Sequence, residues 1–192
     1  MNSTPHLSRI TLLSALVFVL AAAAVLPITA RAATAAEIDR SVRTGLRKLY
    51  AGTSSARVVG QGAKAVLVFP SIIKGGFIVG AQGGEGALLS GGITLGYYNT
   101  VAASYGLQAG VQKFGYALFF MTNSALAYLN KSGGWELGTG PSLVVVDTGM
   151  AESLTTTTLR DDVYAFSFDQ KGLMGGLSLQ GSKITRITPP RR

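Results

Sequence analysis

The sequence contains no cysteine and only one histidine, His6. Without cysteine the chain can form no disulfide, no thiol nucleophile and no lipid-attachment site. His6 lies in a segment that we expect to be removed, so zinc sites built from Cys and His, and catalytic triads that use His, are excluded as well. We therefore expect neither a metal nor a cofactor, and we do not expect an enzyme.

The first 32 residues have the order of a secretory signal peptide. The stretch MNSTPHLSR carries one arginine and no acid, residues 10–26 are uncharged and largely apolar, and Ala30-Arg31-Ala32 provides the small residues of a cleavage site. We predict cleavage after Ala32 and export to the periplasm or outer envelope. The alternative is a retained anchor, because 17 residues lie at the lower limit of a membrane span. Cleavage would remove Arg9 and Arg31 and lower the net charge from +8 to +6.

Residues 33–187 are long enough to form one domain with an ordinary core, followed by a short basic tail at 188–192. The stretch AAEIDRSVRTGLRKLYAG predicts a helix, because apolar residues recur with the helical period at Ile38, Val42, Leu46 and Leu49. The opposite arc is basic and carries Arg40, Arg43, Arg47 and Lys48.

This basic amphipathic helix has two interpretations. Helices of this kind lie on anionic membrane surfaces. Equally, a helix can pack its apolar face on the core and leave its charges in water. The periodicity alone is compatible with both.

After the helix, the pattern changes to short strand-like runs. AKAVLVFP is stopped by Pro70, GGEG separates GGFIVGAQ from GALLSGGITLGYY, and KFG predicts a turn between VAASYGLQAGVQ and YALFFM. NSALAYLNKSGG predicts a short second helix capped by Asn123 and ended by Gly133-Gly134. Strands return in WELGTGPSLVVV and VYAFSF, and DQKG predicts a turn into LMGGLSLQGS and KITRI. We predict an α+β fold, mostly β: a strongly curved or closed antiparallel glycine-rich sheet with an N-terminal amphipathic helix and a short second helix.

Glycine accounts for 25 residues, all of them after residue 32. The pairs Gly75-Gly76, Gly83-Gly84 and Gly91-Gly92 are spaced like hairpin turns between apolar runs. Neither G-x-x-x-x-G-K-[ST] nor G-x-G-x-x-G occurs, so these glycines do not indicate a nucleotide-binding loop.

Two other patterns resemble catalytic sites only weakly. Ser71-Ile72-Ile73-Lys74 matches S-x-x-K, but its partner motifs S-D-N and K-T-G are absent, and we assign the stretch to a turn with an exposed lysine. The carboxylates Asp161, Asp162, Glu85 (in a predicted turn) and Glu136 form no convincing pair, which favours structural or solvated roles.

Nucleic acid would be a natural partner for a chain of this charge. Export argues against it, and no basic strand carries interleaved aromatic residues. Tyr164, Phe166 and Phe168 alternate without lysine or arginine between them and are predicted to belong to the core.

Four blocks occur in an order and spacing that resemble the SYLF domain family, over residues 37–187. They are AKAVLVFPSIIKGGFIVGAQGGEGALL, ASYGLQAGVQ, FFMTNSALAYL and YAFSFDQKGLMGGLSLQGSKI. The last block is the most specific. The family's W-S-x-P stretch is replaced here by GYYNTVAAS.

The resemblance implies a lipid-binding module. Eukaryotic members bind phosphoinositides through a basic amphipathic helix, some fungal members also bind actin, and bacterial members are exported. By position the helix corresponds to residues 36–50, which makes Arg40, Arg43, Arg47 and Lys48 candidates for headgroup binding. Lys64 and Lys74 match basic positions around the family's P-x-x-x-K-G-G-F block.

The sequence therefore predicts a non-enzymatic module that binds anionic phospholipid headgroups at a membrane surface. For an exported chain, the ligand would be an anionic lipid such as phosphatidylglycerol, cardiolipin or lipid A. The alternative is a structural or protein-interaction component of the bacterial cell envelope, with a protein partner and no lipid specificity.

Overall fold

A computed structural model of the chain describes residues 32–76, 79–105, 110–131, 133–146, 154, 159–172, 179 and 181–190. The chain divides into two compact units, Met1–Ala32 and Ala33–Arg192. Every helix and strand described below lies in the second unit. Residues 1–31 of the predicted signal peptide lie outside the described residues. Within the described ranges, no helix is both long enough and apolar enough to cross a membrane.

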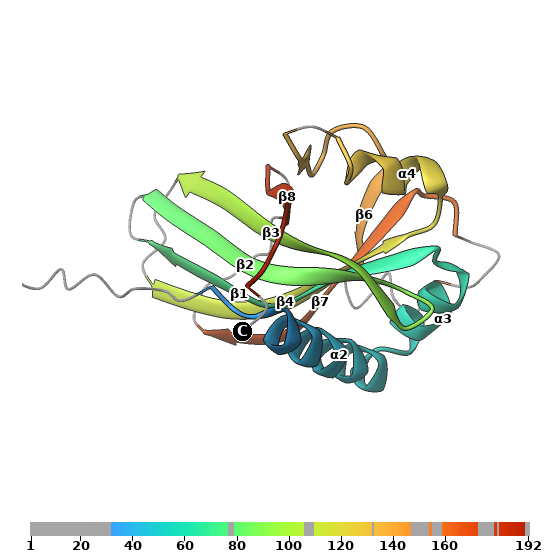
Figure 1. Cartoon of the computed structure of the whole chain (residues 1–192), viewed down its shortest axis with the longest axis horizontal. Helices are drawn as coiled ribbons and strands as arrows, with labels where there is room; N and C mark the ends of the chain where they lie inside the picture. The colour runs from blue at the N-terminus through green and yellow to red at the C-terminus, as the bar shows by residue number, and fades with distance from the viewer. Residues whose placement is uncertain are drawn as a thin grey trace, which may run out of the picture. The chain divides into compact units, whose positions relative to one another are not determined.

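The second unit is a single curled sheet with helices packed against it (Figure 1). The helices are α2 (Ala35–Gly52), α3 (Ser54–Gly62) and α4 (Asn123–Tyr128). The strands are β1 (Ala65–Gly76), β2 (Val79–Ser90), β3 (Ile93–Tyr105), β4 (Gly110–Phe120), β5 (Trp135–Glu136), β6 (Leu143–Val146), β7 (Val163–Gly172) and β8 (Lys183–Ile187). They lie in the order β5-β8-β3-β2-β1-β4-β7-β6. The predicted fold class is confirmed, with the exception that β6 and β7 pair in parallel.

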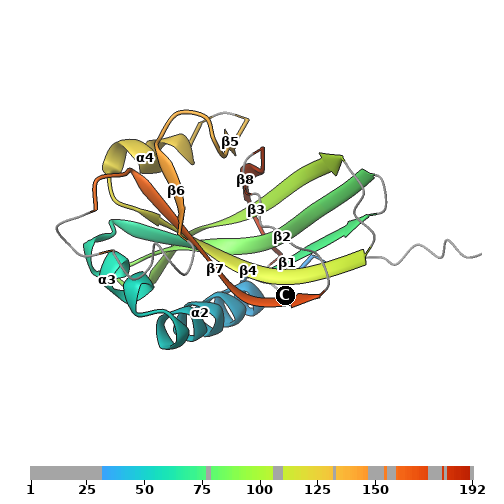
Figure 2. The same ribbon diagram turned by 180° about the vertical axis from the view of Figure 1, so that it is seen from behind.

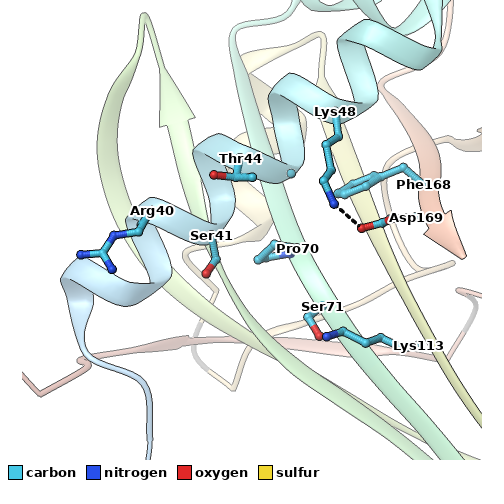
Figure 3. Close-up of a pocket in the computed structure, with 10 residues that line it drawn as sticks. Arg40, Ser41, Thr44, Lys48, Pro70, Ser71, Lys113, Phe168 and Asp169 are labelled. Atoms are coloured by element: carbon cyan, nitrogen blue, oxygen red, sulfur yellow. Dashed lines mark hydrogen bonds and ion pairs between the residues drawn. The ribbon is translucent and has the colours of Figure 1, made fainter. Parts of the chain in front are cut away.

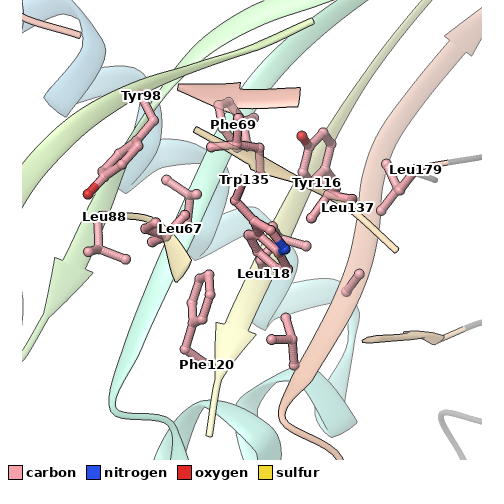
Figure 4. Packing of buried hydrophobic residues seen from close by; sticks show 14 of the residues in the cluster. Leu67, Phe69, Leu88, Tyr98, Tyr116, Leu118, Phe120, Trp135, Leu137 and Leu179 are labelled. Carbon is pink, nitrogen blue, oxygen red and sulfur yellow. The ribbon is translucent and has the colours of Figure 1, made fainter. Parts of the chain in front are cut away.

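Each face of the sheet has its own hydrophobic cluster. On one side, which we call the α2 face, α2 and α3 pack over Val66, Val68, Phe119 and Phe166. On the other side, which we call the α4 face, α4 and β5 cover Leu67, Tyr116, Leu118 and Phe120 (Figures 2 and 4). Trp135 is 1% exposed and packs its ring against Phe120 at a centroid distance of 5.7 Å. The described members of both clusters all lie at or after Ala33.

The two strongest sequence patterns correspond to well-formed elements. In α2, the predicted apolar face is buried at Ile38, Val42 and Leu49 and half-buried at Leu46. In β7, Tyr164 and Phe166 are buried on the α2 face, and Phe168 packs against the same cluster. In both cases a period of 3.6 or 2 residues was enough to identify the buried side.

Several predicted turns are wrong, because their glycines lie inside strands. Residues 83–86 (GGEG) are in the middle of β2, so Glu85 is a strand residue, and residues 113–115 (KFG) lie within β4. Residues 169–172 (DQKG) remain in β7. Gly91-Gly92 does form the predicted turn, since both residues have positive φ, 55° and 81°. A glycine in the sequence therefore does not by itself distinguish a turn from a strand position at which a neighbouring chain segment leaves no room for a side chain.

The helices also differ from the prediction in three respects. A second helix, α3, follows α2 directly and was not predicted. The predicted short helix exists as α4, but Thr122 caps it instead of Asn123, accepting a hydrogen bond from the Ala125 N–H at 3.2 Å. It ends at Tyr128, before the glycines that were expected to terminate it. Most of the stretch LMGGLSLQGS lies outside the described residues.

Pro70 does not end β1, because the strand bulges there and continues to Gly76. The register of β1 shifts between Phe69 and Ile72 against β4, and between Val68 and Ile73 against β2. Proline is tolerated at a bulge, where no ladder hydrogen bond is lost. The neighbouring glycines of β2 accommodate the bend: a Cβ atom on Gly86 would collide with the Val68 carbonyl oxygen, and one on Gly84 with that of Ser71.

We predict that Gly86→Ala lowers the free energy of unfolding by about 2 kcal/mol, since the added methyl group must push the β1 backbone away. Gly75→Ala is the matched control. Its Cβ would meet Val111 at 3.8 Å, an ordinary contact, so no loss is expected. Urea unfolding monitored by circular dichroism measures both. Equal midpoints for the two variants would contradict the steric role of the bulge.

Candidate functional site

Helix α2 is fixed on the sheet at its beginning and along one side. Its first turn is a capping box, in which the Thr34 hydroxyl accepts from the Glu37 N–H and the Glu37 carboxylate accepts from the Thr34 N–H at 2.8 Å. Further along, Asp39 accepts hydrogen bonds from Thr94 at 2.9 Å and from Tyr97 at 3.2 Å, both on β3. These contacts determine which side of α2 faces β3 and which faces β7.

On the β7 side, the ring of Phe168 lies between two glycines. A Cβ atom on Gly45 of α2 would be 3.1 Å from this ring, and one on Gly115 of β4 would be 2.5 Å from it. The absence of both side chains lets the helix and the two strands meet around one aromatic ring. Asp169, the next residue, has a φ of 54° in the left-handed region, which aspartate tolerates better than most residues.

A pocket of about 310 Å³ lies between α2, β1, β4 and β7 (Figure 3). Cationic side chains come from Arg40 and Lys48 on the helix and from Lys113 on β4. Hydroxyl groups come from Ser41, Thr44 and Ser71. The Lys48 Nζ donates to the Asp169 carboxylate at 2.7 Å, and these side chains are 55% and 39% exposed.

The pocket region carries an excess of positive charge around one carboxylate. The hydrogen bond from Lys48 and its charge, together with the charges of Lys171 and Lys113, hold the pKa of Asp169 below its usual range. Lys171 pairs directly with Lys113 across β4 and β7. Like charges directly opposite each other on neighbouring strands repel. Among the described residues, four cations (Arg40, Lys48, Lys113 and Lys171) and the carboxylate of Asp169 leave a net of three positive charges, a balance that attracts anions.

The other two arginines of the predicted basic face lie outside this pocket. Arg43 donates to the carbonyl oxygen of Gly92 at 2.9 Å, in the turn between β2 and β3. Arg47 donates to the Thr44 hydroxyl at 3.3 Å and remains exposed. The four basic residues of α2 are thus divided between the β3 side, the outer surface and the β7 side.

The structure does not bring Lys64 or Lys74 to the pocket. Lys64 is exposed just before β1, at six residues or roughly 20 Å of strand from Pro70. Lys74 lies two residues after Ile72, which belongs to the α4-face cluster, so strand alternation directs Lys74 away from α2. Ser71 lines the pocket on the α2 face, and the S-x-x-K serine and lysine therefore lie on opposite faces of the sheet.

Two of the four carboxylates considered from the sequence, Asp162 and Glu85, accept structural hydrogen bonds. Asp162 accepts hydrogen bonds from the Ser142 N–H at 3.1 Å and from the Thr122 hydroxyl at 2.9 Å. Both bonds lower the pKa of Asp162, and the bond from Ser142 has the larger effect. Glu85 accepts from the Ala33 N–H at 3.2 Å. Glu85 and Glu37 both line a smaller pocket of about 190 Å³ at the start of α2, where Glu37 closes the capping box. Within the described ranges, no group of three His, Cys, Asp or Glu side chains is placed to hold a metal.

Sequence reasoning identified Arg40 and Lys48 but missed Lys113, Lys171 and Asp169. Helical periodicity is a local signal, and it placed Arg40 and Lys48 on the exposed arc of the helix. The other three come from strands whose neighbours are known only once β4 and β7 are paired in register. Lys113 lies in the stretch KFG, which was predicted to be a turn, so it was not considered as a site residue.

The Lys48–Asp169 pair predicts a pH-dependent contribution to stability. Because the pKa of Asp169 is lowered in the folded protein, the pair stabilises above the ordinary aspartate pKa, and this contribution is lost as the pH falls through the folded value. We expect Asp169→Asn to have a slightly lower melting temperature than the wild type at pH 6 and the same one once the pH has fallen below the folded pKa of Asp169. The effect is small because both partners are exposed. A difference that persists unchanged in acid would contradict the ion pair.

Comparison with known proteins agrees with the resemblance seen in the sequence blocks. The family model Ysc84, described as Las17-binding protein actin regulator, matches residues 101–188. No curated protein matches the chain. The matched part begins in β3 and contains β4, β7 and β8, so Lys113, Phe168 and Asp169 lie inside it, whereas α2 precedes it. The family predicted from the sequence is thereby confirmed for this part of the chain: residues 101–188 match the Ysc84 (SYLF) domain family.

Proposed function

We propose that this protein is a non-enzymatic module that binds anionic phospholipid headgroups at a membrane surface, with the pocket between α2 and β7 as its headgroup site. The observation that carries the proposal is that Arg40, Lys48 and Lys113 line one pocket in which, among the described residues, Asp169 is the one carboxylate. A phosphate group would accept from these cations and from the neighbouring hydroxyl groups, and hydrogen bonds between charged partners are the stronger ones.

The outer surface of α2 adds an unspecific electrostatic contribution. Arg47 is exposed beside Thr44, and Arg40 is exposed at the edge of the pocket. Each lysine or arginine close to an anionic surface contributes about 1 kcal/mol. Four to six such residues support micromolar, salt-sensitive binding without a deep cavity.

We further propose that the mature protein begins at Ala33 and acts outside the cytoplasm, in the periplasm or outer envelope. The support is the signal-peptide pattern of residues 1–32 and the division of the chain into compact units between Ala32 and Ala33. In that compartment phosphatidylglycerol, cardiolipin or lipid A provides the anionic headgroup.

The alternative is a protein-interaction role in the cell envelope. The matching family is described as Las17-binding protein actin regulator, which refers to protein partners and supports this alternative. In that case binding to vesicles would not depend on lipid charge, and α2 would be a packed and solvated helix.

Co-sedimentation of residues 33–192 with vesicles tests the proposal. We expect pelleting with phosphatidylcholine vesicles that contain phosphatidylglycerol, none with phosphatidylcholine alone, and a strong loss between about 50 and about 300 mM salt, over which screening increases. The triple variant Arg40→Glu, Lys48→Glu, Lys113→Glu should weaken binding by at least ~100-fold, since each removed cation contributes about 1 kcal/mol. Asp169→Asn should strengthen it.

The matched control reverses three exposed charges elsewhere: Lys64→Glu, Lys131→Glu and Arg160→Glu. It changes the net charge by the same amount and should weaken binding far less. Equal losses in the two triple variants would mean that only overall charge matters and that the pocket is not a site. No pelleting of the folded wild type under any condition would refute lipid binding and favour a protein partner.

A further inference from the structure

Beyond α2, strands β1–β4 carry an apolar surface that no described helix covers. Figure 1 shows these strands extending past α2 at the end opposite α3. Two rows of residues cross these strands by direct pairing. In the first row, Ile73 pairs with Gly83, which pairs with Val101. In the second row, Gly75 pairs with Val111 on one side and with Ala81 on the other, and Ala81 pairs with Ala103. Residues paired directly across neighbouring strands share a face. We call the group of Ile73, Ala81, Val101, Ala103 and Val111 the tip platform.

The tip platform lies on the α2 face and is open to solvent. Ile73 follows Ile72, a member of the α4-face cluster, and it pairs with Lys113, which lines the pocket beside α2. Ile73, Val101 and Val111 are 57%, 50% and 67% exposed, and they are three of the most exposed large apolar side chains among the described residues. Gly75 and Gly83 leave the surface between them flat.

Lysines border the tip platform on both sides. On the β7 side, Ile73 pairs with Lys113, and Lys113 pairs with Lys171. On the β8 side, Val101 pairs with Lys183. The nearest carboxylates on this face, Glu85 and Asp169, already accept from Ala33 and Lys48. An apolar centre with a cationic border is complementary to the boundary between acyl chains and anionic headgroups.

We propose that the tip platform is a membrane-docking surface whose apolar side chains enter the headgroup–acyl boundary of an anionic bilayer. This inference rests on the proposed function and extends it from the headgroup to the apolar part of the lipid. The two surfaces share Lys113, which borders both the pocket and Ile73. One membrane can therefore engage both at once, with the headgroup phosphates at the cations and the apolar side chains below them.

A tryptophan placed on the tip platform reports its depth. Val111→Trp in residues 33–192 is mixed with anionic phosphatidylglycerol vesicles, with and without bromine on the acyl chains. The native Trp135 is 1% exposed and provides a constant background. We expect the added emission to shift to shorter wavelength and to be quenched at least twofold by brominated acyl chains. The control is Val145→Trp. Val145 is 40% exposed but pairs with Ala165 of the α4-face cluster, so it should remain unquenched.

The outcomes separate this inference from the proposed function. Pelleting with anionic vesicles while the tryptophan at 111 stays unquenched would retain headgroup binding and overturn the docking surface. No pelleting of the wild type would overturn both. A wavelength shift that appears without vesicles and rises with protein concentration would show a second copy on the platform, and would equally overturn membrane docking.

A separate observation concerns the start of the second unit. The Ala33 nitrogen lies 3.2 Å from the Glu85 carboxylate, in the small pocket that is also lined by Glu37, Ser41 and Ser71. Among the described residues, Glu37 and Glu85 are the charged side chains that line this pocket. Glu37 closes the capping box at the N-terminus of α2, where a carboxylate is favoured. Glu85 is a half-buried strand residue that accepts from the Ala33 N–H.

We infer that cleavage after Ala32 places a positive group beside Glu85. Hydrolysis of the Ala32–Ala33 peptide bond by water leaves a carboxylate on Ala32 and an amine on Ala33, which takes up a proton at neutral pH. The hydrogen bond from an amide to Glu85 then becomes an ion pair between the new amino terminus and a half-buried carboxylate. Removal of the leader thus strengthens the attachment of α2 to β2.

The test compares two forms of the chain, each with and without Glu85→Gln. One form begins at Ala33, and the other carries Gly-Ser ahead of Ala33, which moves the amino group away while keeping the amide. At pH 7, Glu85→Gln should lower the melting temperature by roughly 2–4 °C in the first form and by clearly less in the second. The difference between the forms should disappear as the pH rises above about 8, where the terminal amine loses its proton.

Equal effects of Glu85→Gln in both forms would overturn the ion pair. Sequencing the amino terminus of the exported protein tests the chemical premise, and we expect it to begin at Ala33. Any other first residue would overturn the inference, since the amino group would then lie elsewhere.

Discussion

The arrangement of the site depends on the ring of Phe168 and the two glycines that enclose it. Gly45 brings α2 close to β7 from one side, and Gly115 brings β4 close from the other. The same contact directs Asp169, the next residue, toward Lys48. Without this close approach the helix would stand further from the sheet, and Arg40, Lys48 and Lys113 would not share one pocket.

The division of the basic residues of α2 follows from how the helix is held. Asp39 fixes the β3 side through Thr94 and Tyr97, so Arg43 lies over the turn at Gly92. Lys48 is directed to the opposite side. A helix that looked evenly basic in sequence therefore presents a localised cluster beside β7 and only an unspecific charge elsewhere. The two interpretations of the helix, packed on the core and available to an anionic surface, are both compatible with this arrangement.

The sequence predicted the parts of the fold that depend on regular spacing. The apolar face of α2 and the alternation in β7 are signals within one element, and both are confirmed. The turns at GGEG and KFG were wrong because the need for glycine there arises from another chain segment: the bulge of β1 at Gly86 and the Phe168 ring at Gly115. Lys113 and Lys171 were missed for the same reason, since strand pairing alone makes them neighbours of the helix.

The carboxylate of Asp169 gives Lys48 a partner before any ligand arrives. It balances one of the four surrounding cations and holds the Lys48 ammonium at 2.7 Å, so a singly charged anion that takes its place exchanges one negative charge for another. An anion with two or more charges gains in the same exchange. On the proposed headgroup function, cardiolipin with its two phosphates would therefore be held more tightly than phosphatidylglycerol with one.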